Sequence, residues 1–241
     1  MARKGLSRMS LMTADVIRLA VDVLLHAGAI LLAGFVFVQV WRQGAVLWRV
    51  LAFPAAYLGL VAGFWASVLV LRAILLRRIT PGTYRLSEPA AVRWIVADSF
   101  MRMVQRSFLH GYIDDFAPMR YLFYRSLGAR IDRTFFFGWD AKITDPWALA
   151  VGRDVIIGSF AVILGHSVEG DQVILDRVEI GDGATVGIRS VIMPGVKIGA
   201  RAMVGACSLV LKGTTIPAGE IWAGVPARKI GGGAAASPKQ V

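Results

Sequence analysis

The side chain best suited to proton chemistry in this sequence is His166, which lies in the segment GHSVEGD at residues 165–171. A neutral imidazole titrates near physiological pH, so it can remove a proton from an acceptor hydroxyl or amine. An isolated histidine is more often structural, and its position alone favours that alternative. The functional interpretation gains weight because this segment interrupts a regular repeat, and loops on rigid scaffolds carry many functional sites.

The repeat around His166 has a period of six residues and is clearest from Ile180 to Trp222. Its marker positions are aliphatic until a tryptophan ends the series: Ile180, Val186, Ile192, Ile198, Val204, Val210, Ile216 and Trp222. A helix repeats every 3.6 residues and a half-buried strand every two, so neither explains this period. The pattern is typical of a hexapeptide-repeat β-helix, in which short parallel strands and tight turns form stacked triangular coils.

A shorter series with the same period precedes it, at Val151, Ile157 and Ile163. The 17 residues from Ile163 to Ile180 are not a multiple of six. We therefore expect the chain to leave the coil between residues 164 and 179, where His166 lies. The β-helix is predicted to span residues 131–230. Residues 231–241 are small and polar, which predicts a disordered tail.

The positive charge of the chain is concentrated in its first half. The net charge is +11, and residues 1–130 carry 16 Lys and Arg against six Asp and Glu. Hydrophobic residues make up 56% of the sequence, and the long apolar runs share this basic half. An anionic membrane surface is therefore a better partner than nucleic acid, for which no recognition motif is present. The single cysteine, Cys207, excludes an intrachain disulfide and a cysteine metal cluster, and we expect a buried thiol.

Residues 1–80 are predicted to form a membrane hairpin with transmembrane helices at about 16–40 and 50–76. Residues 50–71 contain no charge and would form a helix about 33 Å long, enough to cross the hydrocarbon core. A cleaved signal peptide is the alternative for the first run. Basic residues flank both ends of the hairpin, so the positive-inside rule places both termini and the β-helix on the cytoplasmic side of a bacterial-type inner membrane. Gly59 and Gly63 form a GxxxG pattern that can help helices to pack closely.

Residues 81–130 are predicted to form an amphipathic helical linker. Over residues 89–109, one helical side collects apolar residues: Val92, Ile95, Val96, Met103 and Val104. A helix lying on the membrane surface and a buried globular helix explain this pattern equally well. A second short helix is expected at about residues 119–127.

The last part of the chain combines the His166 loop, the six-residue repeats and a Gly224-Val225-Pro226-Ala227 ending. In this combination, residues 127–230 resemble the left-handed β-helix acyltransferases of the hexapeptide-repeat superfamily, and most closely the branch of maltose, galactoside and xenobiotic acetyltransferases. The wider arrangement also resembles the membrane-embedded C-terminal region of poly-lysine synthetases and related peptide-synthetase-like proteins. That second resemblance rests on looser motifs at residues 127–131, 143–146 and 164–166.

The resemblance implies a homotrimer with active sites between subunits, an acyl-CoA donor such as acetyl-CoA, and His166 as general base. The remaining roles are assigned by position. Glu169 is expected to orient the imidazole, and Asp145 to face the same cleft from the coil below and bind substrate. Which of the two carboxylates assists His166 stays open, and a solvated carboxylate is the alternative for both. The residues implied for CoA are Gly187, Ile188, Gly205 and Ala206 along the pantetheine, and Lys212, Arg228 and Lys229 at the phosphates. Ile188 replaces the small polar residue often found at its position in the family.

Together these features predict a membrane-anchored O- or N-acyltransferase that acts on a glycan, lipid-linked or peptide-like acceptor at the membrane. The alternative is a non-catalytic β-helix that supports a membrane synthase, for which CoA binding is the discriminating measurement. Carbonic anhydrases share the implied fold but need three histidines around a zinc ion. The other two histidines, His26 and His110, precede the predicted coil, so we expect no metal.

Overall fold

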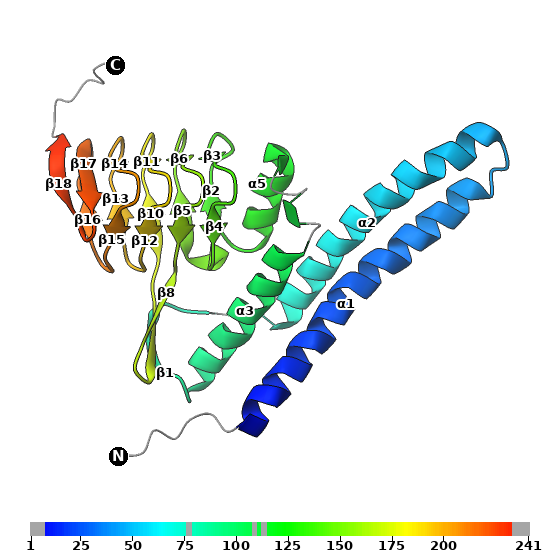
Figure 1. Ribbon diagram of the computed structural model, residues 1–241, viewed down its shortest axis with the longest axis horizontal. Helices are drawn as coiled ribbons and strands as arrows, with labels where there is room; N and C mark the ends of the chain where they lie inside the picture. The colour runs from blue at the N-terminus through cyan, green and yellow to red at the C-terminus, as the bar shows by residue number, and fades with distance from the viewer. Residues whose placement is uncertain (1–7, 76–78, 108–109, 112–114, 233–241) are drawn as a thin grey trace. The chain divides into compact units, whose positions relative to one another are not determined.

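The computed structural model describes residues 8–75, 79–107, 110–111 and 115–232 (Figure 1). The chain divides into two compact units. The helical unit comprises Met1–Arg77 and Ser99–Asp114, and the β-helical unit comprises Arg78–Asp98 and Asp115–Val241. One helix, α3 (Pro89–Arg106), contributes residues to both units.

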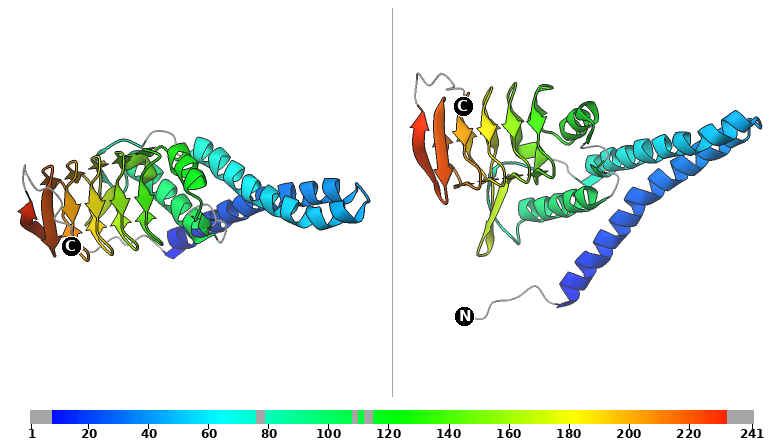
Figure 2. Two further views of the ribbon diagram at one scale, coloured as in Figure 1. Left: turned by 90° about the horizontal axis from the view of Figure 1, so that it is seen from above. Right: turned by 45° about the horizontal axis from the view of Figure 1, so that its top comes forward.

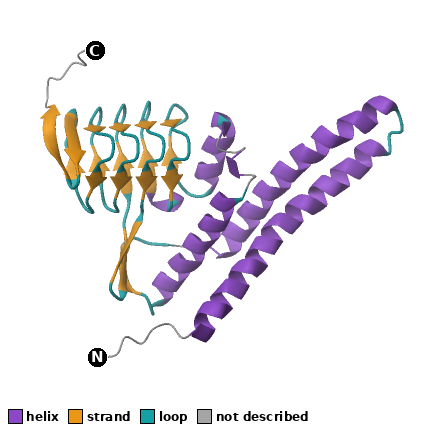
Figure 3. Cartoon of the chain, in the orientation of Figure 1, coloured by secondary structure: helices purple, strands orange, loops and turns teal. Residues whose placement is uncertain are grey.

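The helical unit contains two long helices, α1 (Arg8–Trp41) and α2 (Val46–Leu75), joined by a short turn (Figure 3). Within them, Asp22–Trp41 and Val46–Val70 are long and apolar enough to cross a membrane. Large apolar side chains point outward from both helices; Leu31 is 73% exposed and Phe53 is 64% exposed. Apolar residues that face outward in this way are typical of a lipid-facing surface.

The GxxxG glycines of α2 lie where that helix meets α1. A Cβ atom on Gly63 would lie 2.8 Å from the Cα of Ala29, and one on Gly59 would lie 3.3 Å from the Cα of Ala33. Both distances are too short for ordinary packing, so the two backbones approach each other closely because these positions carry no side chain.

The β-helical unit contains three parallel sheets that form the sides of a coil (Figures 1 and 2). The first sheet contains, in stacking order, β2 (Arg130–Ile131), β5 (Leu149–Val151), β10 (Val178–Ile180), β13 (Lys197–Ile198) and β16 (Thr215–Ile216). The second contains β3 (Phe136–Phe137), β6 (Ile156–Ile157), β11 (Thr185–Val186), β14 (Met203–Val204) and β17 (Glu220–Gly224), and ends in antiparallel β18 (Ala227–Gly232). The third contains β4 (Lys142–Ile143), β7 (Val162–Ile163), β12 (Val191–Ile192) and β15 (Leu209–Val210).

The marker positions of the six-residue repeat stack on one another through the core. Ile180 pairs with Ile198, and Ile198 with Ile216, so one regular coil takes 18 residues. All three side chains are at most 3% exposed. The predicted period therefore arises because every sixth side chain points into the prism and packs against its equivalents in neighbouring coils. At the base of the prism, helix α5 (Ala117–Ser126) places the buried Tyr124 ring 5.8 Å from the ring of Phe137.

The predicted interruption of the repeat is present as a β-hairpin. Val151 pairs with Ile180, which lies 29 residues further along the chain rather than 18. The additional residues form β8 (His166–Glu169) and β9 (Gln172–Leu175), which project from the coil (Figure 3). Strand β1 (Gly82–Arg85) pairs with β9, so a segment from far upstream completes a three-stranded antiparallel sheet.

The N-terminal half of α3 packs on this hairpin. Its Ala91 and Trp94 form a buried cluster with Val173 and Leu175 of β9. The apolar residues that were expected on one side of this helix differ in their burial. Val92 and Val96 are exposed, whereas the buried hydrophobic positions of α3 are Ala91, Trp94, Ala97, Phe100, Met101 and Val104.

The expectation of a buried thiol at Cys207 is also wrong. Cys207 is exposed and has a φ of 56° in the turn that follows Gly205 and Ala206. Its side chain points away from the prism because turn residues connect the sheets at the corners, outside the core formed by the marker positions.

Candidate active site

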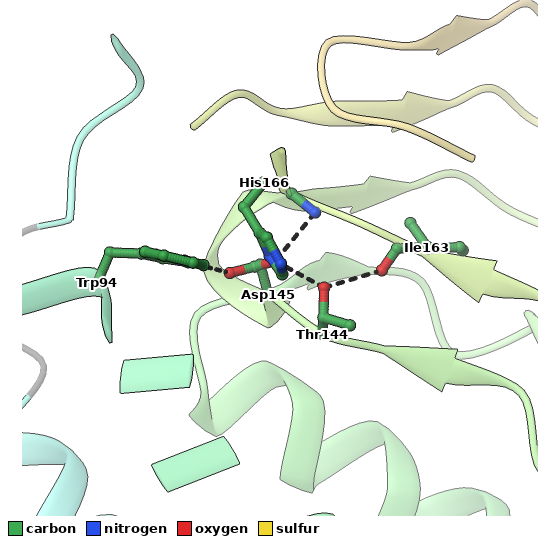
Figure 4. Close-up of polar contacts among 6 residues, drawn as sticks. Trp94, Thr144, Asp145, Ile163 and His166 are labelled. Carbon is green, nitrogen blue, oxygen red and sulfur yellow. Dashed lines mark hydrogen bonds and ion pairs between the residues drawn. The ribbon is translucent and has the colours of Figure 1, made fainter. Parts of the chain in front are cut away.

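The site is built around a histidine–aspartate pair on neighbouring coils. His166 begins β8, directly after the turn that leaves β7, and Asp145 directly precedes the short 3₁₀ helix η1 (Pro146–Ala148). The His166 Nδ1 atom lies 2.6 Å from the Asp145 Oδ2 atom (Figure 4). Because an ionised carboxylate only accepts hydrogen bonds, the Nδ1 atom donates, and in the neutral imidazole the lone pair then lies on Nε2.

Asp145 is held by several donors in addition to His166. The Thr144 hydroxyl donates to Oδ2 at 2.6 Å, and the Gly165 backbone N–H donates to the same oxygen at 3.0 Å. The Trp94 Nε1–H donates to Oδ1 at 3.0 Å. Asp145 is only 4% exposed, so these bonds replace the water that the carboxylate has lost.

The donors keep the carboxylate ionised in spite of its burial. Burial by itself would raise the pKa of Asp145, but the hydrogen bond and charge of His166 lower it, as do the hydrogen bonds from Thr144 and Trp94. The net result is a pKa below the usual value for aspartate. A charged, fixed carboxylate next to an imidazole stabilises the protonated ring, which favours proton transfer to Nε2.

The His166 imidazole lies at the edge of the buried region. Its side chain is 19% exposed, and its ring centroid lies 4.6 Å from that of Trp94, with the two planes inclined by 50°. A partly exposed histidine with an ordered carboxylate partner has the arrangement that general-base catalysis requires.

Of the two candidate carboxylates, Asp145 is the one that contacts the imidazole of His166. Glu169 forms an ion pair with Lys212 and accepts a hydrogen bond from Ser167 at 3.2 Å, so the carboxylate bonded to the imidazole Nδ1 is that of Asp145. Asp145 is 4% exposed, and its oxygens bond to His166, Thr144, Gly165 and Trp94. Proximity in sequence suggested Glu169, but β8 extends away from the coil and takes this side chain with it.

The residues implied for the pantetheine channel form a column at one corner of the coil. A Cβ atom on Gly187 would lie 2.4 Å from the backbone nitrogen of Ala206, and one on Gly158 would lie 2.6 Å from that of Ile188. The backbone turns after the second sheet are therefore stacked in direct contact, and Gly205 continues the column. Ile188 is 52% exposed, so an apolar side chain projects from this corner.

Two of the three cations implied for CoA phosphates have acidic partners. Lys212 pairs with Glu169, and Lys229 with Glu220. The Arg228 guanidinium donates to the Ala227 carbonyl oxygen at 3.0 Å, and no ion pair with a carboxylate is present for it among the described residues. Lys212 follows β15 of the third sheet, so its ion pair with Glu169 connects the hairpin to a coil nearer the C-terminus.

Trp94 and Thr144 are site residues that sequence reasoning missed. Thr144 directly precedes the candidate Asp145. Its hydroxyl can donate a hydrogen bond to a neighbouring carboxylate, and this was the signal that could have identified it. Trp94 lies 51 residues before Asp145, and its only signal was a large aromatic residue on a predicted amphipathic helix. Two other histidines, His26 and His110, belong to the helical unit, and no group of three or more metal-ligating side chains occurs in the described ranges.

Comparisons with known proteins bear on the repeat region. No curated protein matches the sequence. Among solved structures, a maltose O-acetyltransferase from Clostridium difficile 630 is 18% identical, with 64% of this chain and 94% of that chain covered and a TM-score of 0.47. A hexapeptide-repeat acetyltransferase from Vibrio cholerae O1 biovar eltor, complexed with acetyl coenzyme A, is 18% identical (62% and 92% covered, TM-score 0.41).

A third solved structure is a mutant of the N-acyltransferase AntD from Bacillus cereus, in complex with dTDP and coenzyme A. It is 21% identical over 41% of this chain and 60% of that chain, with a TM-score of 0.36. Residues 177–212 match the family described as bacterial transferase hexapeptide (six repeats). The predicted resemblance is thus confirmed for this segment, which forms part of a left-handed parallel β-helix.

Proposed function

We propose that the protein is a membrane-anchored acyltransferase that moves an acyl group from an acyl-CoA, with acetyl-CoA as the expected donor, to a hydroxyl or amine of an acceptor at the membrane. The observation that carries this proposal is the 2.6 Å contact between His166 and the buried Asp145. His166 lies on a hairpin that leaves a hexapeptide-repeat coil, and Asp145 belongs to the coil itself.

In the proposed reaction, the acceptor hydroxyl oxygen or amine nitrogen attacks the thioester carbonyl carbon, and the Nε2 lone pair of His166 takes the proton from that oxygen or nitrogen. The new C–O or C–N bond forms, the C–S bond breaks, and CoA leaves as a thiol by taking that proton back from the imidazolium. Asp145 stays ionised and stabilises the imidazolium in between. General-base assistance of this kind contributes about 10²–10⁴ in rate.

An active site between copies of the chain is part of the proposal, and the topology supports it. The Gly187–Ile188 turn lies at the corner between the second and third sheets, whereas His166 leaves at the corner between the third and first. A single coil keeps these corners apart. In a trimer, the glycine column of one subunit can face the histidine of its neighbour, so that CoA lies between them.

Membrane anchoring is supported by the outward-facing apolar side chains of α1 and α2 and by their length. Such an anchor favours an acceptor that is itself held at the bilayer, such as a lipid-linked sugar or a peptide-like product. Acyl-CoA is cytosolic, which agrees with the cytoplasmic orientation expected from the basic flanks.

The test uses the full-length protein in detergent or nanodiscs. Calorimetry with acetyl-CoA measures donor binding, and release of free CoA thiol measures transfer to a panel of sugars, amines and lipid-linked acceptors. We expect His166→Ala to lose about 10²–10⁴ in turnover while its affinity for CoA is unchanged. Absence of CoA binding by the wild type would contradict the proposal and favour the non-catalytic scaffold.

A further inference from the structure

We infer that Trp94 is a positioning residue for the His166–Asp145 pair, so that the segment between the membrane helices and the β-helix is an integral part of the active site. The catalytic meaning of this inference rests on the proposed acyltransferase function. The contacts that carry it lie within the β-helical unit, which includes residues 78–98 as well as the coil.

The first observation is that the two Asp145 oxygens accept hydrogen bonds from different donors. Oδ2 accepts hydrogen bonds from His166, Thr144 and the Gly165 backbone, whereas the one donor to Oδ1 among the described contacts is Trp94. Trp94 is 5% exposed and Asp145 is 4% exposed, so water does not readily replace the indole N–H. A buried carboxylate oxygen without a donor is costly, so the indole fixes the rotation of the carboxylate and thereby the oxygen presented to His166.

The second observation is that the same indole contacts the histidine. The ring centroids of Trp94 and His166 lie 4.6 Å apart, and Figure 4 shows the indole and the imidazole converging on Asp145 from different elements. The indole therefore excludes water from one side of the imidazole. A drier environment strengthens the interaction between the imidazolium and the Asp145 carboxylate.

The third observation is that elements outside the repeat hold Trp94 in place. Trp94 packs with Ala91, Val173 and Leu175 in a buried cluster. The segment is also fixed through its backbone, because β1 pairs with β9, and the Leu86 N–H donates to the Asp171 carbonyl at 2.8 Å. The segment that carries Trp94 is therefore built onto the hairpin that carries His166, and the hexapeptide repeats alone do not complete the site.

Trp94→Phe separates positioning from simple packing, because phenylalanine keeps an aromatic ring in the cluster but lacks the N–H. For the full-length protein in nanodiscs, we expect kcat/KM to fall about tenfold or more, as for loss of a hydrogen bond to a charged group, with CoA affinity within about twofold of wild type. The acid limb of the pH profile, which reports protonation of the general base His166, should also shift, because the carboxylate that stabilises the imidazolium has one donor fewer. Trp139→Phe is the matched control, since Trp139 belongs to the same unit and is 72% exposed.

An active wild type whose Trp94→Phe variant keeps both its rate and its pH profile would overturn the inference and leave the proposed function intact. A wild type without CoA binding or transfer would overturn the proposed function and, with it, the catalytic role of Trp94. NMR of protein labelled with ¹⁵N-tryptophan tests the contact independently of activity. The Trp94 indole proton should exchange slowly, and faster in Asp145→Ala; exchange as fast as that of Trp139 would overturn the inference.

Discussion

The Nδ1 atom of His166 lies 2.6 Å from Oδ2 of Asp145, although the two residues are 21 positions apart in the chain. Asp145 follows β4 and His166 follows β7, and these strands are neighbours in the third sheet. Stacking of one coil on the next therefore brings the pair together. The position of the imidazole relative to Asp145 is therefore set by the pairing of β4 with β7 in the coil.

Asp145→Asn should reduce kcat by roughly 10²–10⁴ while CoA affinity stays within about twofold of wild type. The amide lacks the charge that stabilises the imidazolium. Its NH₂ group would face the donors His166, Thr144 and Gly165 in one orientation, or the donor Trp94 in the other. Steady-state kinetics with saturating acetyl-CoA measure the effect. A kcat within about fivefold of wild type would contradict the orienting role of this carboxylate.

The same residue predicts how stability depends on pH. The pKa of Asp145 is lower in the folded protein than its usual value of about 3.9. The unfolded chain therefore binds more protons near that pH, so this carboxylate stabilises the fold above about pH 4 and loses its contribution as the pH falls further. Unfolding of wild type and Asp145→Asn in detergent at pH 3 to 7 should show a stability difference that shrinks at the acid end. A difference that stays constant over this range would contradict the lowered pKa.

The ion pair of Glu169 with Lys212 yields a contrasting expectation. Glu169 is exposed and pairs with Lys212, and this pair lowers the pKa of its carboxyl. Because the carboxylate bonded to the imidazole Nδ1 is that of Asp145, Glu169→Gln should leave kcat within about twofold of wild type, in the range expected for surface pairs. Kinetics run beside Asp145→Asn compare the two carboxylates directly. A loss in Glu169→Gln as large as that in Asp145→Asn would restore the original assignment.

The fold could be predicted from the sequence wherever the residues follow the six-residue period. Ile180, Ile198 and Ile216 occupy equivalent places in successive coils, so their period reveals the stack and its interruption. The same pattern limited the carboxylate partner of His166 to Glu169 or Asp145 but did not decide between them. Its identity depends on which coil lies beneath the hairpin, and that register includes the irregular turn at η1. Trp94 was harder still, since its contact with Asp145 arises from the tertiary docking of α3.

Membrane orientation remains a prediction from the basic residues that flank the two apolar helices. We expect a fluorescent reporter fused to the C-terminus to be active in the cytoplasm, and a reporter that requires export to be inactive there. Placing the same reporters in the turn between α1 and α2, at Gly44, provides the opposite control. Export-dependent activity at the C-terminus would show that the β-helix lies on the outer side, where cytosolic acyl-CoA does not reach it.

The glycine column is the feature that most directly links repeat geometry to stability. Gly187→Ala would place a methyl group 2.4 Å from the Ala206 backbone nitrogen, and a backbone in the next coil cannot move aside as a side chain can. We expect a loss of about 3 kcal/mol in the free energy of unfolding, at the upper end of overpacking costs.

Gly231→Ala is the matched control in the same unit. The added carbon would lie 3.9 Å from Cδ1 of Ile221, an ordinary contact, so the change should stay within about 0.5 kcal/mol. Thermal unfolding of both variants, followed by circular dichroism of the β-helix, makes the comparison. Equal midpoints would mean that the turns at Gly187 and Ala206 are not in direct contact. The corner would then be too loosely packed to form the rigid wall that the proposed CoA site requires.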